Sequence, residues 1–218
     1  MYSEALHPWI EVPINRIFVL AAIALALLVL RDYLKLLPLL SGSLVRCRGN
    51  IEIEHSVSQA RGRNRCALVG LFILALLTDR YKLYPADFLG VIPQAWQALA
   101  TLGVLVSYII LRAIIFTFFR LPKLDSESRK AAHTAIYNYF LAFLPLMLAS
   151  VGILWIFKAN DSVVRWILWV ETFAFLWLTL RRKGQILSLK YSPLKTFLYL
   201  CALEVLPFAC LVIPAVLL

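Results

Sequence analysis

Two glutamates, Glu171 and Glu204, lie inside apolar stretches of the sequence, where an ionisable side chain is energetically costly in a membrane. Glu171 precedes Arg181 by ten residues, and Glu204 follows Lys195 by nine. If both stretches are helices that end at these cations, a rise of about 1.5 Å per residue places the carboxyl groups about 15 Å and about 13 Å from the same membrane face. The spacing therefore predicts two carboxyl groups at nearly one depth.

Arg112 is predicted at the same level, because it lies eight residues before Arg120 in a third apolar stretch. Its guanidinium group can bind one carboxylate through two parallel hydrogen bonds, and the other carboxyl group then needs a hydrogen-bond partner or a proton. Glu204, Glu171 and Arg112 are the candidate binding residues of an intramembrane polar cluster. Two interpretations stay open: a proton or cation site, or a buried polar contact that fixes helix packing, which we favour.

Familiar catalytic patterns are missing from the sequence. It contains no phosphate-binding loop, no G-x-G-x-x-G, no H-E-x-x-H and no C-x-x-C. The histidines His7, His55 and His133 fall on three different segments, so no pair is placed to hold a metal or haem. We therefore expect no metal site, no cofactor and no enzymatic activity, and we expect the cysteines to be free thiols.

The composition indicates the elements that must position these residues. Of the 218 residues 62% are apolar and 16% are charged, and the mean hydropathy is +0.82, whereas soluble domains are about 45–50% apolar and about 25% charged. A membrane-spanning helix needs about 20 apolar residues. We predict an all-α transmembrane bundle, one integral membrane domain over residues 1–218 with a cytoplasmic loop over 31–65. The expected spans are 14–30, 66–78, 88–111, 134–157, 163–180 and 196–218. The segment 66–78 is short for a full crossing.

The distribution of Lys and Arg predicts the orientation of this bundle. Alternate connections carry 17 of the 22 basic residues on one side and 5 on the other. Because cytoplasmic loops of membrane proteins are enriched in Lys and Arg, both termini are predicted outside, an N-out/C-out topology. The formal net charge of +10 then reflects topology, and the expected partner is the lipid bilayer, not nucleic acid.

The C-terminal part of the chain carries a more specific pattern. Residues 191–207 contain Lys-Thr-Phe, Tyr-Leu-Cys and Leu-Glu-x-x-Pro in succession. This stretch, under a tenth of the chain, resembles the closing motif of a family of integral membrane proteins of the Bacteroidota, domain of unknown function 4271. The resemblance implies a protein of a bacterial inner (cytoplasmic) membrane and implies no activity. The family-like positions are Lys195, Tyr199, Cys201, Glu204 and Pro207.

These observations lead to two functional hypotheses. The first is a non-enzymatic component or assembly subunit of an envelope complex, with other proteins or further copies of the chain as partners. The alternative is a small proton- or cation-coupled transporter or channel that uses Glu204 and Glu171, with Arg112 as the counter-charge.

Overall fold

A computed structural model describes residues 9–45, 56–84, 87–118, 126–188 and 191–210. All regular secondary structure within these ranges is helical. The elements are η1 (Trp9–Glu11), α1 (Pro13–Val45), α3 (Val57–Arg80), α4 (Asp87–Gly90), α5 (Gln94–Phe118), α6 (Ser126–Ile156), α7 (Asp161–Ser188), α8 (Pro193–Leu200) and the π-helical turn η2 (Cys201–Val205). The prediction of an all-α bundle is confirmed at this level.

Local signals explain where several helices begin. The hydroxyl group of Ser56 accepts a hydrogen bond from the backbone N–H of Gln59, which caps the start of α3. Pro193 lies in the first turn of α8, where a missing N–H is not needed. The long helix expected from residue 88 is divided, because α4 ends at Gly90 and α5 begins only at Gln94, directly after Pro93.

The connection expected over 31–65 is mostly helical in the structure. Helix α1 continues to Val45 and α3 already begins at Val57, so the helices are longer than the apolar stretches that predicted them. Among the polar residues at the start of α3, Arg63 faces the protein and is only 2% exposed, whereas Arg61, Asn64 and Arg65 are exposed.

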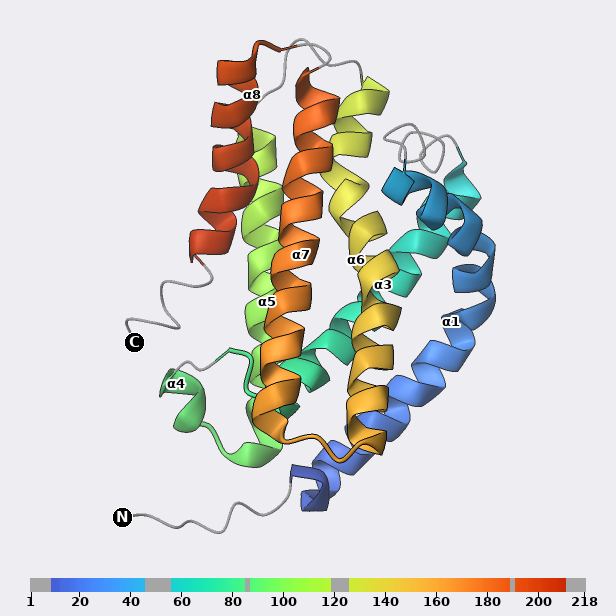
Figure 1. Cartoon of the computed structure of the whole chain (residues 1–218), viewed down its shortest axis with the longest axis vertical. Helices are drawn as coiled ribbons and strands as arrows, with labels where there is room; N and C mark the ends of the chain where they lie inside the picture. Colours follow the sequence, from blue (N-terminus) through green and yellow to red (C-terminus); the bar gives the residue numbers. More distant parts are fainter. Residues whose placement is uncertain (1–8, 46–55, 85–86, 119–125, 189–190, 211–218) are drawn as a thin grey trace.

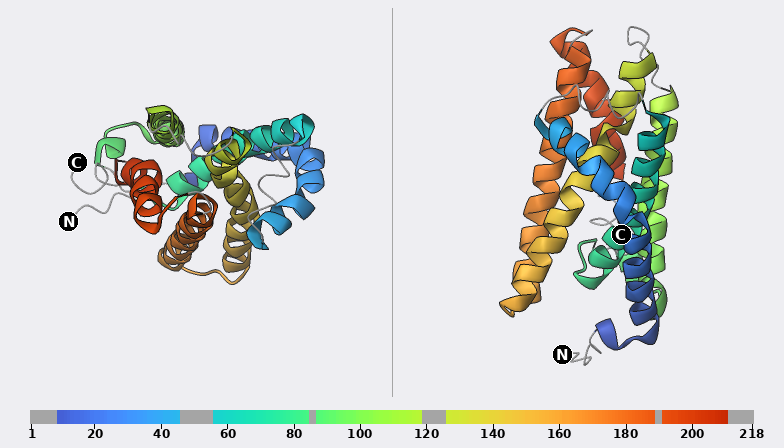
Figure 2. Two further views of the ribbon diagram at one scale, coloured as in Figure 1. Left: turned by 90° about the horizontal axis from the view of Figure 1, so that it is seen from above. Right: turned by 90° about the vertical axis from the view of Figure 1, so that its right-hand side faces the viewer.

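The helices form an elongated bundle (Figure 1). Consecutive long helices run in opposite directions, and α5, α6, α7 and α8 lie roughly along the long axis. Helix α3 crosses the bundle obliquely and packs against α1, α5 and α6 (Figures 1 and 2). The C-terminal ends of α5 and α7 therefore lie at the same end of the bundle as the N-terminal ends of α6 and α8.

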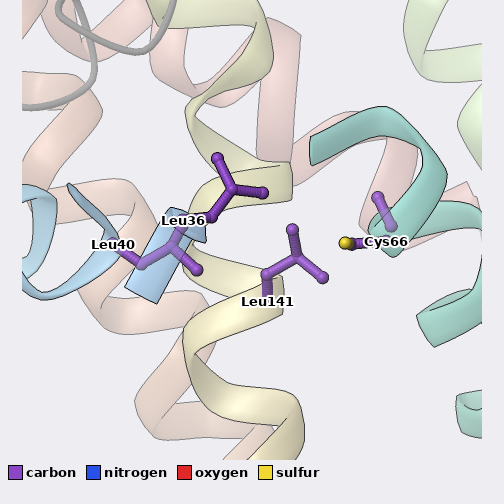
Figure 3. Close-up of a cluster of buried hydrophobic side chains, with 5 residues drawn as sticks. Leu36, Leu40, Cys66 and Leu141 are labelled. Atoms are coloured by element: carbon purple, nitrogen blue, oxygen red, sulfur yellow. The ribbon is translucent and has the colours of Figure 1, made fainter. Parts of the chain in front are cut away.

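The packing between α1, α3 and α6 is apolar and close. Leu36 and Leu40 of α1, Cys66 of α3 and Leu141 of α6 form one buried cluster (Figure 3). Nearby, an added Cβ atom at Gly70 of α3 would lie 2.9 Å from side-chain atoms of Phe140 and of Leu144, both on α6. Small residues that let helices approach closely are typical of membrane bundles.

Within the described residues, five helical segments are long and apolar enough to cross a membrane: Pro13–Leu44, Gln94–Phe118, Ala132–Ile156, Asp161–Gln185 and Pro193–Cys210. Between 11% and 22% of each apolar window is buried inside the protein. Side chains such as Leu28, Phe118 and Trp155 are 78–80% exposed. Long apolar helices with apolar outer surfaces are typical of a multi-pass membrane protein. The stretch 66–78 lies in α3, which is not among the five.

Polar contacts connect the helices at the end of the bundle where α3 finishes and α7 begins. Trp9 Nε1 donates to Asp79 Oδ2 at 2.7 Å, and Lys82 Nζ lies 2.9 Å from Asp79 Oδ1. Arg165 of α7 donates through Nε to the carbonyl of Tyr81 at 2.9 Å. These contacts tie the C-terminal end of α3 to η1 and to the start of α7.

Candidate functional site

We call the segment Pro193–Cys210, which contains α8 and η2, the C-terminal membrane helix. It contains an irregular turn at Glu204. Residues Cys201–Val205 form a π-helical turn, in which the N–H of Leu206 bonds to the carbonyl of Cys201. Pro207 follows directly and has no N–H, and its ring would collide with the carbonyl of residue 203 in a regular α-helix. The wider π turn accommodates this proline, and such turns are frequent at functional sites.

Glu204 forms a salt bridge with Arg112 of α5. Arg112 Nη2 lies 3.1 Å from Glu204 Oε1, and Arg112 Nε lies 3.3 Å from Oε1 and 3.4 Å from Oε2. Arg112 Nη2 also donates to the carbonyl of His133 on α6 at 2.9 Å. The two ionic side chains are 4% and 3% exposed, so the pair lies in the interior. It links α5, α6 and the C-terminal membrane helix.

A second cation, Lys183 of α7, also bonds to Glu204. Lys183 Nζ donates to the same Oε1 atom that accepts from Arg112, and the Lys183 side chain is only 4% exposed. We call Arg112, Lys183 and Glu204 the ion cluster. Two cations face one carboxylate, so the ion cluster has a formal net charge of +1. Because burying charges costs several kcal/mol per ion (order of magnitude), the mutual contacts must offset a large desolvation penalty.

Helix direction explains why Lys183 reaches Glu204. Lys183 lies five residues before the end of α7, about 8 Å along the axis, and Glu204 lies eleven residues after the start of α8, about 16 Å. Side chains on a helix tilt toward its N-terminus. Since α7 and α8 are antiparallel, the Lys183 side chain points along the axis toward Glu204, and Glu204 points back toward it.

Lys183 is not among the site residues predicted from the sequence. The prediction ends the membrane span before Arg181, whereas α7 continues without interruption to Ser188. A lysine two residues past the presumed boundary is then inside the bundle. The signal that could have found it is the helical continuation of residues 181–188, which contain no Pro.

The structure brings Arg112 and Glu204 together and places Glu171 elsewhere. Glu171 lies twelve residues before Lys183 on α7, about 18 Å along the axis. It is partly exposed, and Ser150 Oγ of α6 lies 3.2 Å from its Oε2 atom. The expected three-residue cluster is therefore formed with Lys183 in the position that the sequence reasoning gave to Glu171.

The family-like positions occupy different environments on the C-terminal membrane helix. Lys195 is exposed near the start of α8, and Cys201 is half-buried with a free thiol. The Tyr199 ring packs on that of Tyr191, with centroids 5.1 Å apart. Glu204 and Pro207 are buried. Only Glu204 of these five positions belongs to the ion cluster.

Comparison with known proteins leaves the site to be interpreted from its geometry. No protein-family model, no curated protein and no solved structure matches the chain. The site consists of an interior carboxylate, Glu204, that lies within a π turn and contacts two cations from two other helices. Such a group can fix helix packing, and its surplus positive charge can attract an anion.

Proposed function

We propose that this chain is a non-enzymatic multi-pass protein of a bacterial inner membrane, acting as a subunit or assembly component of an envelope complex. The observation that carries the proposal is the engagement of Glu204 by both Arg112 and Lys183 in the interior. A carboxylate held by two cations suits a fixed contact between helices better than a group that must repeatedly release and take up a proton.

We further propose six membrane crossings with both termini outside. Helix α3 is the sixth crossing: its 24 residues extend about 36 Å along its own oblique axis, and a hydrocarbon core is about 30 Å thick. It runs obliquely from the level where α1 ends to the lower part of the bundle (Figure 1). It packs against α1, α5 and α6, and the protein covers two of its charged residues, Arg63 and Asp79, which would be costly against lipid. The resemblance of residues 191–207 to the Bacteroidota family supports an inner-membrane location.

The transport alternative requires Glu204 and Glu171 to lie on one path. Lys183, which contacts Glu204, lies about three helical turns from Glu171 on α7. The two glutamates therefore lie at different levels of the bundle, which argues against a shared site. Proton flux into liposomes containing the purified chain tests it. Flux that Glu204→Gln or Glu171→Gln abolishes would restore transport as the function.

The experiment for the leading proposal is purification of the tagged chain from native membranes in a mild detergent, followed by mass measurement of the intact particle. A second multi-pass membrane protein of similar size, tagged in the same way, serves as the control. We expect a stoichiometric protein partner, or further copies of the chain, that the control does not retain. A particle containing a single copy and no other protein contradicts the proposal, as does turnover of a substrate by the chain alone.

A further inference from the structure

A cavity of about 560 Å³ lies beside the ion cluster, between α3, α5 and α6, with Phe175 of α7 at its wall. Its volume falls in the range of roughly 300–1,000 Å³ that is typical of small-molecule sites. Arg112 belongs both to the ion cluster and to the lining of the cavity. A molecule in the cavity would therefore contact Arg112, which belongs to the positively charged ion cluster.

The lining changes from polar to apolar along all three helices. On α3 it runs from Arg63 to Leu74, about 16 Å, and on α5 from Arg112 to Leu105, about 10 Å. On α6 it runs from His133 to Phe140, again about 10 Å. The polar members lie at the bundle end where α5 finishes and where α3 and α6 begin (Figure 1). The cavity thus has one cationic end and one apolar end.

The cationic end is built from interior side chains. Arg63 and Arg112 are only 2% and 3% exposed, and Tyr137 contributes a phenol to the same end. Arg63 is oriented by hydrogen bonds from Nε and Nη2 to Asn64 Oδ1, at 3.1 Å and 2.9 Å. Guanidinium groups present several donors in a fixed plane, which suits a carboxylate or phosphate group.

We propose that this cavity binds a single-chain anionic amphiphile, with its carboxylate or phosphate head at Arg63 and Arg112 and its hydrocarbon chain along Leu71, Leu74 and Leu105. The head would offset the surplus positive charge of the ion cluster, and the chain would occupy the apolar end. The proposal concerns the cavity alone and does not depend on the assignment to an envelope complex.

Equilibrium binding of radiolabelled palmitate to the purified chain in lipid nanodiscs tests this directly. Two matched probes separate head from chain: 1-hexadecanol has the same chain with a neutral head, and acetate has the head alone. We expect saturable binding of one palmitate per chain, at least about tenfold weaker binding of hexadecanol, and no binding of acetate. Equal affinity for palmitate and hexadecanol overturns the proposal, as does palmitate uptake no greater than that of empty nanodiscs.

Two variants place the binding in the cavity. Leu71→Trp fills the apolar end, and Arg63→Gln removes one charge from the other end; Leu28→Trp, on the 78% exposed surface of α1, is the matched control. We expect each cavity variant to weaken palmitate binding about tenfold or more and the control to leave it unchanged. Unfolding of each variant is followed in parallel, and a folded Arg63→Gln or Leu71→Trp variant with unaltered affinity contradicts the site. These outcomes are separate from the co-purification result, which concerns protein partners.

Discussion

Lys183 and Glu171 lie twelve residues apart on α7, and only Lys183 reaches Glu204. The two side chains contact different neighbouring helices. Lys183 connects α7 to α5 and to the C-terminal membrane helix through the ion cluster, whereas Glu171 lies within hydrogen-bond distance of Ser150 on α6. The ion cluster therefore lies toward the bundle end where α5 and α7 finish, whereas Asp79, also buried, lies toward the other end.

Replacement of Glu204 by Gln should strongly destabilise the protein. The substitution leaves Arg112 and Lys183 in the interior without their carboxylate, and breaking a buried ion pair in this way costs about 3–5 kcal/mol. The matched control is Glu171→Gln, whose partly exposed side chain can keep a hydrogen bond to Ser150, so that its cost stays below about 1 kcal/mol. Denaturant unfolding of both variants in the same detergent measures the difference. Equal free energies of unfolding would contradict the role assigned to the ion cluster.

Replacement of Gly70 by Val should weaken the contact between α3 and α6. An added Cβ atom at this position would already lie 2.9 Å from the side chains of Phe140 and of Leu144, so these side chains or the helices must shift. Overpacking of this kind costs about 1–3 kcal/mol. Gly103 on α5 is the control, since nothing lies within 4 Å of an added Cβ atom there, and Gly103→Val should change stability by no more than about 0.5 kcal/mol. Thermal unfolding of both variants tests the prediction, which fails if Gly70→Val is as stable as Gly103→Val.

The helical class and a contact between Arg112 and one of the two carboxylates could be predicted from the sequence, but not that this carboxylate is Glu204. Apolar length and the cost of a charge in lipid are local properties of the chain, so they can be read without knowledge of the neighbours. The partner of Glu204 on α7 could not be predicted in the same way. This partner, Lys183, can be identified only if the end of α7 is known. The cations of residues 181–183 are typical of a membrane boundary, although α7 continues beyond them.

The helical structure at the start of α3 could not be predicted from the sequence either. Its residues Arg61, Arg63, Asn64 and Arg65 are typical of a solvated loop, and the expected connection 31–65 included them. In the structure they belong to α3, where Arg63 is buried against the neighbouring helices and Arg61, Asn64 and Arg65 stay exposed. Tertiary packing decides such cases, because a polar face is tolerated in a helix wherever protein covers it.

Tyr81, just beyond the end of α3, should ionise at a higher pH than an ordinary tyrosine. Burial raises the pKa of Tyr81 above its usual value of 10.0, Arg80 opposes the shift to a smaller extent, and Asp161 adds to it. Above pH 10 the unfolded chain loses this proton first, so the free energy of unfolding should fall as the pH rises toward the folded pKa. The difference between ultraviolet titrations of the wild type and of Tyr81→Phe isolates the group. A transition of Tyr81 at or below pH 10.0 would show that the phenol is not buried.

A double-mutant cycle between Arg112→Gln and Glu204→Gln, measured as free energies of unfolding in one detergent, tests most directly whether this pair fixes the helix packing. We expect the double variant to be more stable than the sum of the single losses implies, with a coupling energy of at least about 1 kcal/mol, because the two side chains are in contact at 3.1 Å in the interior. Additive losses, within about 0.5 kcal/mol, would contradict the claim that the Arg112–Glu204 pair fixes the packing of these helices.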